Sequence, residues 1–434
     1  MLIRRLMVNA VAICCVFGVI IVCSTTANAQ KTVVLEGTIT GKKKLKKNIN
    51  YLLRGGVFIT KKLIVKPGAT IFGLPGSFLV INQGAKIDAR GTIDQPIVFT
   101  SAAPPGTRRR GDWGGLIING RAPINVPGGT AQGEGSTGTY GGGANPDPND
   151  SSGVLSFVRV EYGGFAISPD NELNCVAFQG VGNGTTVEFV QAAFGGDDGF
   201  EWFGGTCNAK NLVVTGAVDD SLDWTFGWSG KVQFAVVQQR SEGTTDAGIE
   251  ADNNENDFTF LPRSHPKIMN MTLVGDPRTT GAQAGTGSTR GILLRRGTAA
   301  ELRNVVVTAF KNVGIEIRDA ETFDQVAADT LTLRGMIFFG NGVGLQTATN
   351  FGGATANSIA QIGVKIVQAD PLLADPFDLV SPDFRPQAGS PALDPANFEP
   401  PFAGDAFFEV ANYVGAFDAN NDWTLGWTNW VLGN

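Results

Sequence analysis

Two short segments of this 434-residue chain carry acidic side chains at the same spacing. They are DDGFEW, which starts at Asp197, and DDSLDW, which starts 22 residues later at Asp219. If the two segments lie in register on neighbouring strands, Glu201 stands beside Asp223. Carboxylates held that close repel one another unless they are protonated, spread into water or bind a cation. The spacing therefore indicates paired carboxylates that could hold a cation.

The same plan recurs along the chain. An apolar strand precedes each acidic segment, and later units lead to GIEAD at Gly248, GILLR at Gly291 and GIEIR at Gly314. The strands are short and are separated by Gly, Asn or Asp, and no helical period of adequate length competes with them. Repeats of this length with several strands per unit predict an all-β fold, a right-handed parallel β-helix solenoid.

Stacking the units in this register produces columns of side chains that alternate between the core and the outer surface. The inward column contains Phe200, Leu222, Ile249, Ile292 and Ile315. The outward column beside it contains Glu201, Asp223, Glu250, Leu293 and Glu316. Because neighbouring strands lie about 4.8 Å apart, the outward column brings three carboxylates together. Ca²⁺ prefers such hard oxygen ligands, and the candidate calcium ligands are Asp198, Glu201, Asp220, Asp223 and Glu250. A solvated acidic face that only shapes the turns is the alternative.

One long domain is expected between a leader and a C-terminal region. Residues 1–29 contain two arginines, an apolar run and an A-N-A site, which together predict a cleaved signal peptide, export and no membrane span in the mature chain. Residues 30–370 are expected to form the β-helix, with long loops near 123–150 and 279–289. The Pro- and Trp-rich residues 371–434 are expected to cap its open end. The sequence leaves the oligomeric state open.

The charge balance excludes some partners. With 34 basic and 40 acidic side chains, the chain as a whole does not attract nucleic acid. Its start is basic, which fits either a solvated end of the solenoid or contact with an acidic glycan or lipid headgroup. His265 is the only histidine, which disfavours a His-dependent triad. Cys175 and Cys207 are the two cysteines outside the signal peptide, and a disulfide between them remains open.

Six segments in this order resemble a known family. They are GDWGG at Gly111, SPDNELN at Ser168, DDGFEWFGG at Asp197, GIEADNNEN at Gly248, FRPQAGSPALD at Phe384 and YVGAFDANNDWTLGWTNW at Tyr413. The chain is similar to exported right-handed β-helix surface proteins of Bacteroidetes and proteobacteria. The resemblance implies a pectate-lyase-like solenoid and export, and it assigns no catalytic residues.

Two functions fit these observations. The first is a non-catalytic secreted or cell-surface protein that binds a polysaccharide or another cell-surface glycan, with Trp228 and Arg318 as ligand-binding candidates, or that has a structural or adhesive role. The second is a calcium-assisted polysaccharide lyase or another carbohydrate-active enzyme, with Arg295, Glu250 and Asp252 as catalytic candidates. An ordinary ion pair between Arg295 and Asp252 is the alternative for these two residues. A loop 123–150 folded over the acidic face would favour a defined site.

Overall fold

The structure is a computed structural model, which describes residues 30–168, 171–240, 245–278, 286–347 and 363–434, without the side chains of 343–347. The expected signal peptide and most of the expected loop at 279–289 therefore lie outside the described residues. Residues 31–434 form one compact unit. None of the described helices is long and apolar enough to cross a membrane.

Twenty-four strands join in one sheet, and every pair of neighbours within it is parallel. The first coils contain β1 (Lys31–Ile39), β2 (Lys42–Leu45), β3 (Ile49–Ile59), β4 (Lys62–Val65), β5 (Thr70–Gly73), β6 (Phe78–Ile81), β7 (Lys86–Arg90), β8 (Ile97–Ser101) and β9 (Leu116–Asn119). The long strands are β12 (Gly153–Glu161), β16 (Thr186–Ala193), β18 (Ala209–Thr215), β20 (Lys231–Gln238), β22 (Lys267–Val274), β24 (Ala300–Thr308), β26 (Leu331–Phe339) and β28 (Gly363–Gln368). The short strands are β15 (Val176–Gln179), β17 (Phe200–Phe203), β19 (Leu222–Thr225), β21 (Ala247–Ala251), β23 (Arg290–Leu294), β25 (Val313–Ile317) and β27 (Val343–Thr347).

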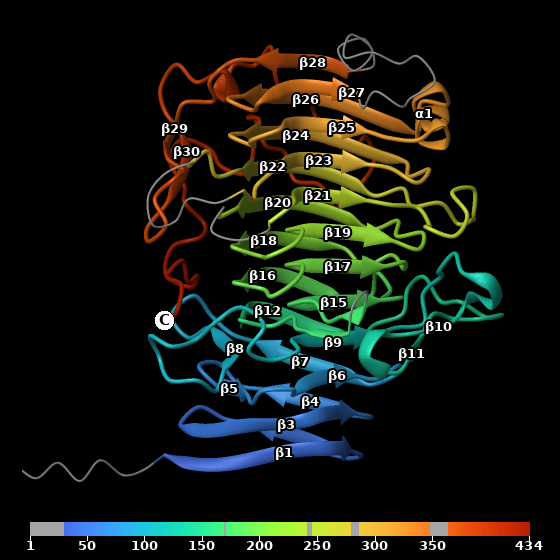
Figure 1. The fold of residues 1–434 in the computed structure, drawn as a ribbon, viewed down its shortest axis with the longest axis vertical. Coiled ribbons are helices and arrows are strands. Elements are labelled where there is room, and N and C mark those ends of the chain that lie inside the picture. The colour runs from blue at the N-terminus through green and yellow to red at the C-terminus, as the bar shows by residue number, and fades with distance from the viewer. Residues whose placement is uncertain (1–29, 169–170, 241–244, 279–285, 348–362) are drawn as a thin grey trace, which may run out of the picture. The chain divides into compact units, whose positions relative to one another are not determined.

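Long and short strands alternate along the chain, and each pairs with the strand of its own kind on the next coil. The pairing β9–β15–β17–β19–β21–β23–β25–β27 is called the short-strand ladder below. The pairing β12–β16–β18–β20–β22–β24–β26–β28 is called the long-strand ladder. Successive coils stack from β1 to β28 (Figure 1), which confirms the predicted right-handed parallel β-helix.

The register predicted from the repeats is confirmed strand by strand. Phe200 pairs with Leu222, and Leu222 pairs in turn with Ile249. All members of this inward column are buried in one continuous core. Trp202 and Trp224 are also buried in this core, and the Trp202 ring stacks on Trp228 with centroids 4.5 Å apart. Large stacked rings of this kind fill the interior of the coils.

A column of left-handed residues bends the long strands. Phe189, Asn211, Asn270 and Asn304 have φ between 52° and 56°, and the paired register skips these positions. Asn tolerates this conformation better than most residues because its short amide can hydrogen-bond locally. The bend lets a single long strand cover two faces of each coil.

The remaining elements lie in the connections. The loop at 123–150 contains η1 (Pro127–Gly129), β10 (Ala131–Gln132), η2 (Glu134–Ser136) and β11 (Thr139–Tyr140); elsewhere are β13 (Ala166–Ser168), β14 (Asn171–Glu172), α1 (Ala320–Ala327), β29 (Leu373–Asp375), β30 (Asp383–Pro386) and η3 (Pro391–Leu393). Cys175 and Cys207 are both buried and free, so no disulfide joins them. Burial raises the pKa of both thiols to about 12, which keeps them protonated.

Residues 371–434 run back along the flank of the coils, outside the long-strand ladder (Figure 1). The segment covers an apolar strip on this ladder with Phe384, Phe417, Trp427 and Trp430. The described contacts of the segment therefore lie on the side of the solenoid. The expected role as a cap over the last coil remains a prediction.

Side-chain amides of the long strands hold this segment. Gln191 donates its Nε2 to the carbonyl of Asn429 at 2.8 Å and accepts the Asn429 N–H at 2.7 Å. Gln233 holds both backbone groups of Glu409 in the same way, each at 2.8 Å. Each amide satisfies a donor and an acceptor that the irregular backbone would otherwise bury without a partner. The C-terminal segment is therefore an integral part of the domain.

We predict that Gln191→Ala lowers the free energy of unfolding by about 1–3 kcal/mol, because it leaves buried backbone groups of Asn429 unpaired. Urea unfolding and limited proteolysis would measure the effect, and cleavage should begin in residues 371–434. Gln95→Ala is the control, because Gln95 is exposed. Equal urea midpoints for the two variants and the wild type would contradict the clamping role.

Candidate functional site

A pocket of about 390 Å³ opens over the short-strand ladder at β17, β19 and β21. Glu201, Asp223 and Glu250 line it from directly paired positions on these three strands. The loop at 123–150 supplies another wall, with Val126, Ala131, Gln132, Glu134 and Tyr140. The loop thus lies over the acidic face, which is the arrangement that favours a defined site.

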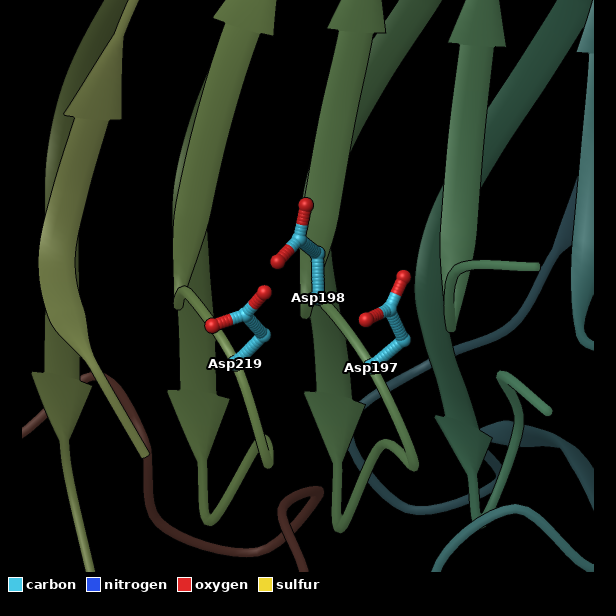
Figure 2. A group of neighbouring side chains, drawn as sticks. All are labelled: Asp197, Asp198 and Asp219. Carbon is cyan, nitrogen blue, oxygen red and sulfur yellow. The ribbon is translucent and has the colours of Figure 1, made fainter. Parts of the chain in front are cut away.

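More carboxylates gather where the chain turns into these strands. Asp197 and Asp198 precede β17, Asp219 and Asp220 precede β19, and Asp246 precedes β21. Figure 2 shows Asp197, Asp198 and Asp219 side by side at neighbouring turns. One oxygen of each of these three carboxylates lies within 4.8 Å of the others. The tandem aspartates therefore stack on successive coils, as the strands do.

Asp198 and Asp220 have a structural role at these turns. Asp198 Oδ1 accepts the backbone N–H of Asp220 at 2.8 Å, and Asp220 Oδ1 accepts that of Ala247 at 2.5 Å. Asn174 has the same role on the preceding coil, since its Oδ1 accepts the N–H of Asp198 at 3.3 Å. Each side chain thus ties one coil to the next. An amide suffices at the first position, so these hydrogen bonds alone do not account for the charge at the other two.

Asp223 lies at the centre of the cluster. Its carboxylate belongs to one triad with Asp198 and Glu201 and to a second triad with Asp220 and Glu250, each with oxygens within 4.8 Å. Asp223 Oδ1 is buried and has no hydrogen-bond partner. An unpaired buried carboxylate oxygen is costly, and a cation would satisfy it. We call Asp198, Glu201, Asp220, Asp223 and Glu250 the carboxylate cluster.

Basic side chains neutralise only one end of the carboxylate cluster. Arg295 is bonded to Glu250 and, through Nε at 2.9 Å, to Asp252, and Arg296 Nη1 lies 2.8 Å from Asp252. Among the described residues no such ion pair reaches Glu201 or Asp223. Glu201 instead accepts a short hydrogen bond from Asn174 Nδ2. The middle of the pocket therefore has no direct ion pair among the described residues, although the charge of Arg295 acts on Asp223.

Burial and mutual repulsion raise the pKa values across the site. The pKa values of Asp198, Glu201, Asp220 and Asp223 rise well above the usual range, first because of burial and then because of the neighbouring carboxylates. Burial also raises the pKa of Glu250 to about 7, although Arg295 opposes the shift. These groups need either protons or a cation to share the pocket at neutral pH.

Burial and repulsion also raise the pKa values of two carboxyl groups beside the carboxylate cluster, Asp197 and Glu134. Burial raises the pKa of Asp197 to about 7, with Asp219 and Glu172 adding repulsion. Burial raises the pKa of Glu134 to about 8, with further repulsion from Asp197, Glu172 and Glu255. Glu134 comes from the loop at 123–150, so the loop adds negative charge to the pocket instead of neutralising it.

Of the nine sequence-predicted site residues, seven lie in the pocket lining or in the carboxylate cluster, and two lie in neither. All five predicted metal ligands form the carboxylate cluster, and Arg295 and Asp252 stand at its end. Arg318 lies outside the pocket lining, where its Nε pairs with Glu316 at 2.8 Å. The proposal that Trp228 binds a ligand is wrong, because its side chain is fully buried and its Nε1 donates to the Cys207 carbonyl.

Sequence reasoning missed several residues of the site. Asp197, Asp219 and Asp246 form the outer row of acidic groups, and the repeated Asp-Asp pair was the signal that could have found the first two. Glu134 and Asn174 come from segments outside the repeats. Their approach to Glu201 depends on the path of the loops, which no spacing in the sequence specifies.

The comparisons with known proteins agree with this architecture. The family model described as a pectate-lyase like beta helix domain matches residues 37–368. No curated protein and no solved structure matches the chain. The matched region contains the carboxylate cluster, the loop at 123–150 and nearly all of the stacked strands.

We predict that the melting temperature of the metal-free protein falls as the pH rises from about 5 to about 8. The folded state holds protons that the unfolded chain releases near pH 4, so stability is lost as pH rises through the raised pKa values, about 7 for Glu250 and about 8 for Glu134. Thermal unfolding in EDTA would measure this. The Glu201→Gln/Asp223→Asn variant should show a shallower decline, and a wild-type melting temperature that is constant or rises over this range would contradict the repulsion.

Proposed function

The chain belongs to the pectate-lyase-like β-helix family, and we propose that it is a secreted or cell-surface member that binds an extended glycan without cleaving it. The proposed binding site is the pocket over β17, β19 and β21. A Ca²⁺ ion bound by the carboxylate cluster would belong to that site. The proposal rests on one observation above all, the unpaired Oδ1 of Asp223 between two carboxylate triads.

The donor set fits Ca²⁺ better than a softer metal. Every side chain in the four acidic triads is Asp or Glu, and neither His nor Cys contributes to them. Ca²⁺ takes six to eight oxygen ligands in flexible geometry, whereas zinc and copper prefer nitrogen or sulfur. Bound at Asp223, Ca²⁺ would supply positive charge and open coordination positions for oxygens of a ligand. Both triads that contain Asp223 could hold it.

The walls of the pocket suit a sugar. Tyr140, Phe203 and Phe226 add aromatic surface, and Gln132 and Gln179 add amides. The Oε1 of Gln179, which also lines the pocket, is buried and has no hydrogen-bond partner. Ligand sites commonly combine apolar walls with a few converging polar groups in this way. A glycan could donate hydroxyls to these acceptors while its own oxygens approach the cation.

A calcium-assisted lyase is the alternative, and the convergence of Arg295 with the carboxylates in one pocket favours it. Such an enzyme needs a base that is free to take a proton next to a uronate carboxylate. Arg295 is held by both Glu250 and Asp252, and its pKa is raised by Asp252 and Glu250 despite its burial. A cation in these ion pairs is poorly placed to act as a base, which weakens the lyase alternative in so far as it depends on Arg295.

Export is included in the proposal. It is supported by the signal-like residues 1–29, with their early arginines, apolar run and A-N-A site. Outside the cell Ca²⁺ is available to sites of moderate affinity. The carboxylate cluster would then bind Ca²⁺ after export.

The proposal predicts glycan binding that depends on both Ca²⁺ and Asp223. A carbohydrate array with acidic and neutral oligosaccharides, probed with residues 30–434 in Ca²⁺ and then in EDTA, would identify ligands. For a ligand so found, Asp223→Asn should weaken binding at least about 10-fold, as expected when a charged partner of a metal is removed. Glu188→Gln is the matched control, because Glu188 lies on β16 outside the pocket.

Incubating the protein with the ligands so identified separates the two functions. The ultraviolet absorbance of an unsaturated product would reveal a lyase, and the binding proposal predicts none. Binding that survives both EDTA and Asp223→Asn would contradict the proposed role of the carboxylate cluster. Formation of the unsaturated product by the wild type, and its loss in Arg295→Lys, would show that the protein is a lyase.

A further inference from the structure

The first coils carry a charge opposite to that of the whole chain. Residues 31–90 contain 12 basic and 2 acidic side chains, a net charge of +10, whereas the complete chain has 34 basic and 40 acidic side chains. These 60 residues form strands β1 to β7. Charge separated in this way creates a local positive field on an acidic protein. The carboxylate cluster lies on later coils, so the two charged regions are distinct.

Three lysines of these coils stand in one column. Lys42 on β2 pairs directly with Lys62 on β4, and Lys62 pairs with Lys86 on β7. The strands of such a ladder are about 4.8 Å apart, and like charges directly opposite destabilise a sheet. Lys62 is compensated by Asp88 at 3.1 Å, but no ion pair with Lys42 or Lys86 is found among the residues that the structure describes. An anion between the ammonium groups would relieve the repulsion.

Protection of an open sheet edge does not explain this column. Lysines on edge strands prevent pairing between molecules, and β2, which pairs only with β4, could use Lys42 for that purpose. Lys62 and Lys86 lie on strands that are paired on both sides, because β4 joins β7 and β7 joins β12. The column therefore continues where no edge needs protection.

The column opens into a small pocket of about 220 Å³. Lys62, Lys86 and Arg90 supply its basic side chains, and Asp88 is paired with both Lys62 and Arg90. Along the next coils, β12 and β16, the lining continues with small and hydroxyl-bearing residues, Ser151, Gly153, Gly184 and Thr186. The pocket thus combines cations with hydroxyl and backbone groups in a concave surface.

We propose that the column Lys42–Lys62–Lys86, with the pocket beside it, is a second binding site, and that it takes the carboxylates of an extended acidic polysaccharide. The lysines provide one cation per coil in a straight row, and a polyuronate presents one carboxylate per sugar along an extended chain. The hydroxyls of Ser151 and Thr186 match sugar hydroxyls. This site uses direct ion pairs and is independent of Ca²⁺ and of the carboxylate cluster.

The shape of the site favours a polysaccharide over an anionic membrane. A membrane presents a flat layer of headgroups, which is a poor geometric match for a row of cations beside a concave pocket. A long nucleic acid would extend along the acidic remainder of the chain and be repelled by it. The acidic remainder confines any polyanion to these first coils.

Binding of polygalacturonate oligomers to residues 30–434 in EDTA tests the proposal, with calorimetry at low ionic strength. The variant Lys42→Gln/Lys62→Gln/Lys86→Gln should lose about 10- to 100-fold in affinity, since each surface ion pair contributes modestly. Salt should weaken wild-type binding, because exposed charges are screened. Asp223→Asn should leave this binding unchanged, so that failure here is distinguishable from failure of the calcium-dependent site.

A second triple variant is the matched control. Lys31→Gln/Lys47→Gln/Lys66→Gln removes the same charge from exposed positions of the same coils, outside the column, and should lose less than about threefold. Equal losses of affinity in the two triple variants would show that binding arises from diffuse electrostatic attraction and not from a defined site, and would overturn the proposal. Binding to phosphatidylglycerol vesicles without binding to the oligomers would also overturn it. Circular dichroism of both variants checks that the coils remain folded.

Discussion

In-register parallel pairing sets the chemistry of this molecule. A β-helix places each residue about 4.8 Å from its counterpart on the next coil, so a repeated acidic residue becomes a column of like charges. On β17, β19 and β21 this places Glu201, Asp223 and Glu250 against one another. Their repulsion is offset at one end by Arg295 and nowhere else among the described ion pairs of the column. The site exists because the fold enforces a proximity that the side chains themselves oppose.

The rest of the domain makes that proximity tolerable. The continuous apolar core beneath the short-strand ladder fixes the register, with Trp202 and Trp224 buried directly behind the acidic residues. Asp198 and Asp220 tie successive turns together through backbone N–H groups. On the flank, buried amides such as Gln191 hold the C-terminal segment against the long strands. Favourable packing in the core and along the flank is what can offset a repulsive site.

Sequence periodicity predicted the fold and the acidic column but not the whole site. The repeated pattern gave the pairing of Phe200 with Leu222 and hence of Glu201 with Asp223, because parallel stacking converts spacing along the chain into contact. The pattern did not place Trp228, which follows β19 outside the repeated segment and packs in the core against Trp202. Glu134 reached the pocket through a loop whose path has no period.

Calcium titration calorimetry on residues 30–434, in two buffers of different ionisation heat, tests whether the carboxylate cluster binds Ca²⁺ in exchange for protons. We expect binding of Ca²⁺ near pH 7 with release of protons, because the ion displaces protons held by carboxyls such as Glu250, whose pKa is raised by burial to about 7. Asp223→Asn should lose that binding, and Glu188→Gln should retain it. The absence of both heat and proton release in the wild type would contradict the account and leave the carboxylate cluster as a protonated structural element.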